Sequence, residues 1–151
     1  MLCLRHNGPA RGRGKGGHAP ARNRCDKIRV DREQYEAVYG FADRDRALKT
    51  DFVKIGWQVG KHTSFVEMTP RHMLSVSSDS DNNKAWKMIP ASMVKLGDNI
   101  LVDRDNERVT ATVRSIAATQ NVGAYAPLTF SDKVVANDVH ASAYVSFVPE
   151  Q

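Results

Sequence analysis

Residues 66–76, VEMTPRHMLSV, combine the alternation of a β-strand with two side chains suited to proton transfer. Thr69 supplies a hydroxyl group, and His72 supplies an imidazole three residues later. An imidazole titrates near neutral pH and a hydroxyl can donate to developing charge, so the pair could assist attack on an amide. The plain alternative is a turn between two strands in which neither side chain has a chemical role. If Thr69 and His72 belong to an acyl-transfer site, its nucleophile must come from elsewhere in the chain.

The chain contains two thiols, Cys3 and Cys25. A thiolate is the competent form for such an attack. Cys3 lies in a segment without the apolar alternation of a strand, so the sequence predicts nothing that would hold its thiol in place. Two cysteines are too few for a disulfide framework, and no Cys/His set has zinc spacing. We therefore expect no metal and no other cofactor.

From Asp26 onward the chain reads as short strands separated by turn signals. The strand segments are rich in Val, Ile, Phe, Tyr and Thr, and Gly, Asp, Asn and Ser separate them. No long window shows helical periodicity, and the one short helical candidate covers residues 90–96. We predict an all-β domain with strands at 27–30, 36–41, 51–59, 64–68, 73–76, 85–89, 99–102, 108–116, 133–136 and 142–148. His62 and His140 are expected on strand faces or turns without a role, and Trp57 in the core or on a sheet face.

The sequence also contains an internal repeat. CDKIRVDR at 25–32 aligns with GDNILVDR at 97–104, and a second strand pattern follows each copy. This similarity predicts two related halves, each opened by a hairpin. Chance similarity between two strand–turn–strand segments is the alternative.

The first 24 residues differ in composition from the rest. They contain six basic residues and no acidic residue, whereas the remaining chain has 16 basic and 17 acidic residues. A segment this rich in Gly, Arg and Pro has little to bury, so we predict a disordered leader at 1–24 and a domain at 25–148. The domain itself is slightly acidic, so nucleic-acid binding would depend on the leader and is the least favoured function. No apolar run is long enough for a signal peptide or a membrane span, and the compartment is left open.

Taken in order, these segments resemble the sequence blocks of the Hint superfamily, which comprises inteins and the Hedgehog C-terminal autoprocessing domain. SFVEMTPRHMLSV (64–76) resembles its Thr-x-x-His block, and IPASMVKLGDNILV (89–102) resembles the block that follows. GAYAPLTF (123–130) and ASAYVSF (141–147) are similar to the ending typical of Hedgehog-type members. DKIRV and VYGFADRD, within 26–45, resemble the first hairpin of the family. The resemblance implies a Hint fold with two pseudo-symmetric halves.

The same resemblance implies self-cleavage chemistry. In this family a first-position cysteine attacks the preceding carbonyl in an N–S acyl shift, and a sterol hydroxyl or water then cleaves the internal thioester. By position, His72 would be the proton shuttle and Thr69 its partner. Asp43 matches the acidic residue that activates the sterol, although a charged turn is an equal interpretation of that segment. The substrate would be the N-terminal segment of an intact relative.

Two departures from the family bear on activity. The family opens with Cys-Phe, but here Cys25 occupies the first Gly position and Cys3 fits the nucleophile by spacing only. Ala143 stands where Hedgehog members carry a cysteine, and the residues after 148 do not continue into a sterol-recognition region. We therefore predict a Hint domain, N-terminally degenerate or truncated, that does not process itself. A non-catalytic remnant or binding module is the alternative.

Overall fold

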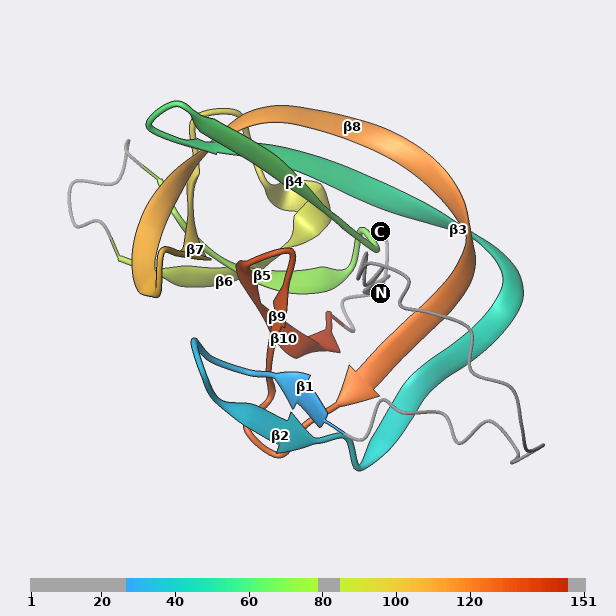
Figure 1. The fold of residues 1–151 in the computed structure, drawn as a ribbon. Coiled ribbons are helices and arrows are strands. Elements are labelled where there is room, and N and C mark those ends of the chain that lie inside the picture. The colour runs from blue at the N-terminus through green and yellow to red at the C-terminus, as the bar shows by residue number, and fades with distance from the viewer. Residues whose placement is uncertain (1–26, 79–84, 147–151) are drawn as a thin grey trace, which may run out of the picture.

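The computed structural model of the protein describes residues 27–78 and 85–146. This part of the chain is almost entirely β-structure, as the sequence predicts. β1 and β2 form a two-stranded sheet, and the larger sheet has the order β4-β3-β8-β7-β10-β5-β6, with β9 paired to β10 (Figure 1). The strands are β1 Lys27–Arg29, β2 Tyr35–Ala37, β3 Gly40–Val59, β4 His62–Met68, β5 His72–Ser77, β6 Lys87–Pro90, β7 Asn99–Arg104, β8 Glu107–Leu128, β9 Lys133–Ala136 and β10 Val139–Val145.

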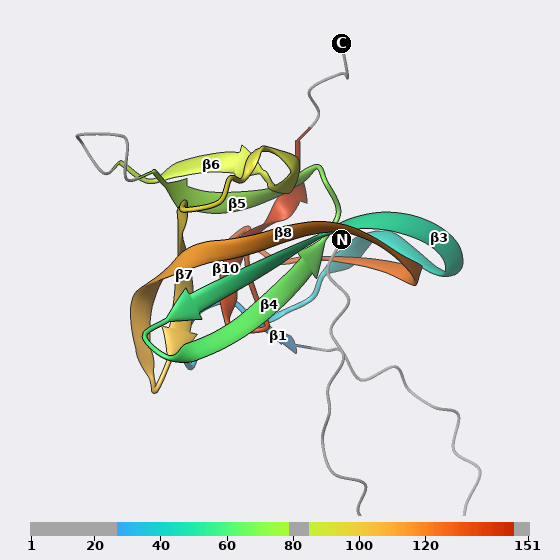
Figure 2. The same ribbon diagram turned by 90° about the horizontal axis from the view of Figure 1, so that it is seen from above.

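β3 and β8 are far longer than the strands predicted at 51–59 and 108–116. They pair antiparallel from Gly40↔Leu128 to Gln58↔Thr112 and curve together round one side of the molecule (Figure 1). Seen from above, β8 runs between the β5–β6 pair and the β3–β4 pair (Figure 2). The polar stretches of β3 and β8 look like turns in the sequence. In the structure the two strands satisfy each other's backbone hydrogen bonds, and this pairing overrides local propensity.

The β3–β8 ladder is irregular along its charged segment. The register shifts between Phe41 and Asp43 and again between Asp45 and Lys49. In the second bulge, Oδ1 of Asp45 accepts hydrogen bonds from the backbone N–H groups of Ala47 and Leu48 at 2.8 and 3.2 Å. The strand predicted at 36–41 is divided between β2 and β3. Bulges of this kind bend a strand and increase its twist, which fits the curvature of the pair.

The two copies of the sequence repeat occupy equivalent hairpins. β1 pairs with β2 and β7 pairs with β8, both antiparallel. The matched apolar positions are buried in both copies, at Ile28 and Ile100 and at Val30 and Val102. The β7–β8 hairpin closes through two residues with positive φ, Asp105 and Asn106, as in a type I′ turn. The hairpins thus face the core in the same way but close through turns of different length.

One short 3₁₀ turn, η1 Ala91–Met93, replaces the helical candidate at 90–96. Gly97 follows with φ of 87°, a value that favours glycine. The core between the sheets contains fully buried side chains from both halves, among them Ile55, Met68, Leu74, Ile100 and Val139. No helix within the described ranges is long and apolar enough to cross a membrane. The leader at 1–24 lies outside the described residues.

Candidate active site

Thr69 and His72 lie at the two ends of one tight turn between β4 and β5. The backbone N–H of His72 donates to the carbonyl oxygen of Thr69 at 3.0 Å. Pro70 takes the second turn position, where its fixed φ is favourable. A turn between strands was the plain interpretation of this segment, and it is correct for the backbone. The same turn brings the hydroxyl-bearing and imidazole-bearing residues together.

Two neighbouring segments hold this turn in place. Pro70 accepts a hydrogen bond from the backbone N–H of Ser92 in η1 at 2.9 Å. The carbonyl oxygen of Arg71 accepts from the N–H of Ser146 at 2.8 Å, and Nε of Arg71 donates back to the Ser146 carbonyl oxygen at 2.9 Å. The turn is therefore fixed by η1 and by the residue that follows β10. The end of the C-terminal strand therefore lies beside the turn.

The imidazole of His72 is removed from solvent. Its residue is 3% exposed and pairs with Val145 in the ladder between β5 and β10. Burial disfavours the charged imidazolium and lowers the pKa of His72 from 6.5 to about 4, although a hydrogen bond with the Ser142 backbone acts in the opposite direction. At neutral pH the side chain is uncharged and able to accept a proton. Once protonated, such an imidazole is a strong acid and gives the proton up readily.

The pKa of His72 predicts a pH dependence of folding stability. Between about pH 6.5 and 4 the unfolded chain binds a proton at this side chain and the folded chain does not. The free energy of unfolding should therefore fall as the pH is lowered through this window, by roughly 3 kcal/mol for a shift of this size. Urea denaturation at a series of pH values measures this slope. His72→Gln, which cannot titrate, should flatten it, whereas the matched control His62→Gln, at an exposed imidazole, should not. An equal slope in wild type and His72→Gln would contradict the burial argument.

Asp43 and the two cysteines are the remaining candidate residues. The backbone at Asp43 lies within β3, opposite Ala126 in β8, and not in the charged turn that was its alternative interpretation. β3 joins β4 only from Val53, which pairs with Met68 directly before the Thr69 turn. The part of Asp43 in activating an acceptor stays a prediction. Cys3 and Cys25 lie outside the described residues, so the nucleophile also stays a prediction.

The structure adds a cluster that the sequence did not predict. His140 lies on β10, and its Nε2 is 2.6 Å from Oδ1 of Asp103 in β7. Nη2 of Arg29 in β1 is 2.7 Å from Oδ1 of Asp138 and 3.9 Å from Oδ2 of Asp103. His140 lies on a strand, as expected, and its contact with Asp103 ties β10 to β7. The signal available in the sequence was the repeated Val-Asp-Arg, whose second copy contains Asp103. Among the residues that the structure describes, no group of three or more His, Cys, Asp or Glu is arranged to hold a metal ion.

Comparison with known proteins places this geometry in a family. The sequence model of the Hint module matches residues 28–150. A segment of 78 residues, 51% of this chain, is 37% identical to 19% of the Indian hedgehog protein of Xenopus laevis. A segment of 110 residues, 73% of this chain, is 24% identical to 22% of Warthog protein 1 of Caenorhabditis elegans. The matched segments thus span about a fifth of each of these relatives. The chain belongs to the Hint module family, and its module is of the Hedgehog type.

Proposed function

We propose that the Thr69–His72 turn is the proton-transfer half of a self-cleaving site of the Hedgehog type. The observation that carries this proposal is the buried, uncharged imidazole of His72 on a turn fixed by η1 and by Ser146. The Thr-x-x-His block also stands in the same order among its neighbouring segments as in the Hint family. A purely structural role of a buried histidine would not account for that order. Membership of the Hint family supplies the reaction class.

The proposed reaction is an N–S acyl shift followed by cleavage of a thioester. The uncharged imidazole of His72 takes the proton of a cysteine thiol, the resulting thiolate attacks the carbonyl carbon of the residue before it, and the carbon–nitrogen bond of that amide breaks. The departing nitrogen takes a proton from the imidazolium of His72, and the Thr69 hydroxyl donates a hydrogen bond at the reacting amide. Water or a sterol hydroxyl then attacks the thioester and releases the thiolate. The low pKa of His72 suits the donation of the proton to the departing amine, because a protonated ring of low pKa gives its proton up readily.

The chain of 151 residues is proposed not to carry out this reaction itself. Residues 1–24 contain neither Cys-Phe nor the apolar alternation of a first strand, and Cys3 is a candidate by spacing alone. Intramolecular attack depends on a nucleophile held at near-attack distance, an advantage of about 7–11 kcal/mol in well-oriented systems. A thiol without a strand to position it loses most of that advantage. The module then remains as a scaffold with half of a site.

A pair of fusions tests both parts of the proposal. In the first, a carrier protein precedes Met1 of the unaltered chain, and incubation with dithiothreitol should leave the mass of the fusion unchanged. In the second, a first strand that begins with Cys-Phe, taken from an active Hint domain, replaces residues 3–24. This fusion should release its carrier when thiol is added, as followed by mass spectrometry.

The two fusions fail in distinguishable ways. Thiol-dependent release of the carrier from the first fusion, abolished by Cys3→Ala, would show that the chain is active as it stands. A second fusion that is folded by circular dichroism yet never releases its carrier would remove the support for a proton-transfer site at Thr69 and His72. The non-catalytic remnant would then be the better description.

A further inference from the structure

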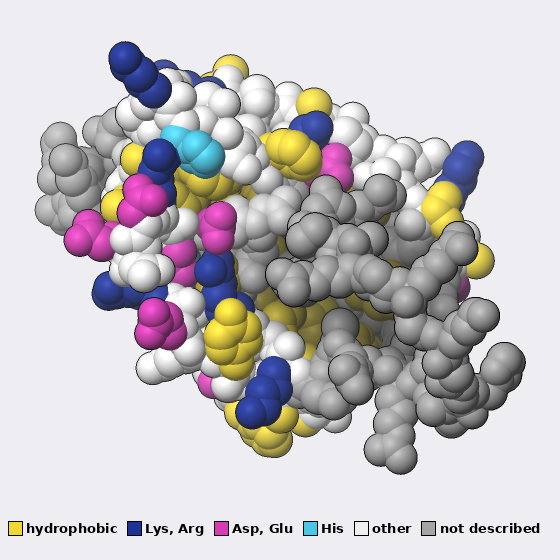
Figure 3. Space-filling model, viewed as in Figure 1, with side chains coloured by type: hydrophobic (Ala, Val, Ile, Leu, Met, Phe, Trp, Pro, Cys, Tyr) yellow, Lys and Arg dark blue, Asp and Glu magenta, His cyan; other side chains and the backbone are white. Residues whose placement is uncertain are grey.

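Three aromatic side chains lie together at the surface where β2, β8 and β10 end. Tyr39 follows β2, Phe130 follows β8, and Tyr144 is the last residue but one of β10. The three residues are 50%, 79% and 45% exposed. Figure 3 shows hydrophobic side chains at the surface over β1 and β2, the strands that lead into Tyr39. We call these three residues the aromatic surface.

Direct contacts join the members of the aromatic surface. The ring centroids of Tyr39 and Phe130 are 4.7 Å apart, and the rings are tilted by 38° to each other. The Tyr144 side chain forms hydrogen bonds with Asp132 and with Tyr39, which raise the pKa of Tyr144 to about 12. The backbone N–H of Tyr39 donates to the carbonyl oxygen of Leu128 at 3.1 Å, which fixes the position of Tyr39 against the end of β8. The three side chains therefore adjoin, with the carboxylate of Asp132 beside them.

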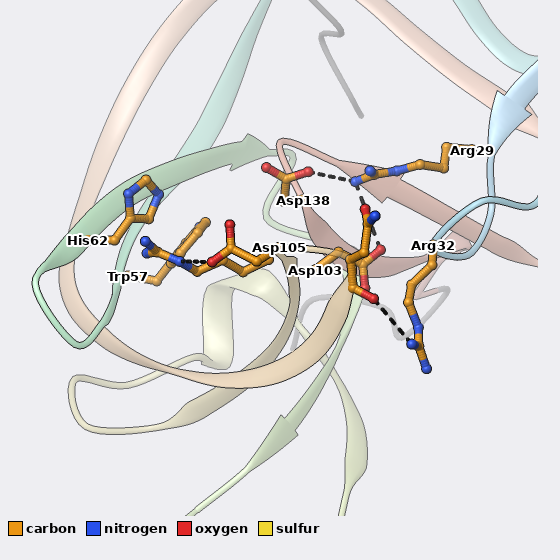
Figure 4. Close-up of a pocket in the computed structure, with 9 residues that line it drawn as sticks. Arg29, Arg32, Trp57, His62, Asp103, Asp105 and Asp138 are labelled. Atoms are coloured by element: carbon orange, nitrogen blue, oxygen red, sulfur yellow. Dashed lines mark hydrogen bonds and ion pairs between the residues drawn. The ribbon is translucent and has the colours of Figure 1, made fainter.

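The carboxylate of Asp132 has no ion-pair partner within the described ranges. Lys133 follows it directly, but no ion pair joins the two side chains. Elsewhere in the domain the arrangement is different, because Arg29 contacts both Asp103 and Asp138 (Figure 4). The aromatic surface thus combines exposed rings with a carboxylate that lacks a cation.

This combination of groups suits an arginine side chain. The face of an aromatic ring carries partial negative charge, and a planar guanidinium group stacks on it. A carboxylate beside the rings accepts two parallel hydrogen bonds from the same kind of group. Each of these interactions is weak at an exposed site, so binding requires that the arginine be held close by.

The basic leader enters the domain next to the aromatic surface. β1 and β2 are antiparallel, and Lys27 lies opposite Ala37. The chain that precedes Lys27 is therefore directed toward Tyr39, which comes two residues after Ala37. Arg22 and Arg24 stand five and three residues before Lys27. An extended chain covers at most about 3.6 Å per residue, so both arginines stay within about 18 Å of Lys27.

We propose that the aromatic surface binds the leader of the same chain through Arg22 and Arg24. Their guanidinium groups stack on the exposed rings, and one of them pairs with Asp132. Attachment to β1 keeps these arginines at an effective concentration in the millimolar range, so weak contacts suffice. The first 24 residues contain no acidic side chain that would compete for the arginines. This binding does not depend on the proposed self-cleavage, and a polyanion that binds the leader must compete with it.

Nuclear magnetic resonance of the full-length chain tests the contact at the arginine side chains. Protons that stack on an aromatic ring move upfield because of its ring current. The δ-methylene protons of Arg22 and Arg24 should therefore resonate upfield of their positions in a synthetic peptide of residues 1–27. Phe130→Leu removes the most exposed of the three rings, so it should move both signals toward the peptide values. A thermal melt checks that the variant is folded before the spectra are compared.

A second exposed phenylalanine provides the matched control. Phe65 on β4 is 42% exposed, and the amino group of Lys54 already lies over its ring at 3.9 Å from the centroid. Phe65→Leu should therefore leave the signals of Arg22 and Arg24 where they are in the wild type.

Three results would overturn the proposal. The first is a wild-type spectrum in which both arginines have the shifts of the peptide, which would mean that the leader does not touch the rings. The second is an equal change in Phe130→Leu and Phe65→Leu, which would place the contact elsewhere on the surface. The third is an upfield shift that grows with protein concentration, which would assign the aromatic surface to the leader of a second copy.

Discussion

In the fusion that carries a Cys-Phe first strand, replacing His72 by alanine is expected to slow thiol-dependent cleavage by about 10²–10⁴-fold. This is the usual contribution of a positioned general acid–base group, and the His72 imidazole is both buried and uncharged at neutral pH. The rate should also fall as the pH is lowered through about 4, where the imidazole of the folded protein becomes protonated. Release of the carrier over time, quantified by mass spectrometry between pH 4 and 8, measures both effects.

Three further substitutions separate chemistry from folding in this experiment. Thr69→Val removes the hydroxyl while keeping the branched shape, and Thr69→Ser, which restores the hydroxyl, should recover most of the lost rate. His62→Ala changes an exposed histidine at the far end of β4 and should leave cleavage unaffected. If the His62 and His72 variants cleave at equal rates, the proton-transfer role of His72 is disproved.

The second large effect concerns the core directly behind the site. Leu74 on β5 has 0% of its surface exposed, and its register partner in β10 is Ala141. Leu74→Ala should lower the free energy of unfolding by about 2–5 kcal/mol, because the cavity left behind adds to the lost transfer free energy. Urea denaturation with an unchanged m-value would measure this loss in the folded state.

The same substitution at an exposed leucine provides the control. Leu96 is 66% exposed in the segment that follows η1, so Leu96→Ala should change the free energy of unfolding by less than about 0.5 kcal/mol. A comparable loss in the two variants would mean that β5 does not pack as the structure has it. Since β5 begins at His72, such a result would also weaken the argument for a buried imidazole.

The sequence predicted the strands correctly where apolar residues alternate along the chain and are buried in the structure. β4, β5, β7 and β9 match their predicted segments to within two residues, because each has apolar side chains facing the core. The outer parts of β3 and β8 could not be predicted, since DRDRALKT and AATQNVG have the composition of loops and become strands through the pairing of β3 with β8. Pairing between distant segments leaves no local signal.

The candidate site could likewise be predicted only in part from the sequence. Thr69 and His72 stand in one short block, so their spacing and their family resemblance were both visible in the sequence. The depressed pKa of His72 was not visible, because it results from burial by β10, which lies much later in the chain. The contact between Asp103 and His140 likewise joins two strands that only folding brings together.

The length of β3 has a consequence for how the protein comes to fold. β3 is complete at Val59, but its partner β8 begins at Glu107 and ends at Leu128. A ribosome adds about 5–20 residues per second, so one edge of β3 stays open for a period on the order of seconds. The hairpin with β4 covers only the part from Val53 onward. Charged side chains on an open strand edge oppose pairing with other chains. We therefore expect the run DRDRALKTD to keep this edge of β3 from pairing with other chains until β8 has been synthesised.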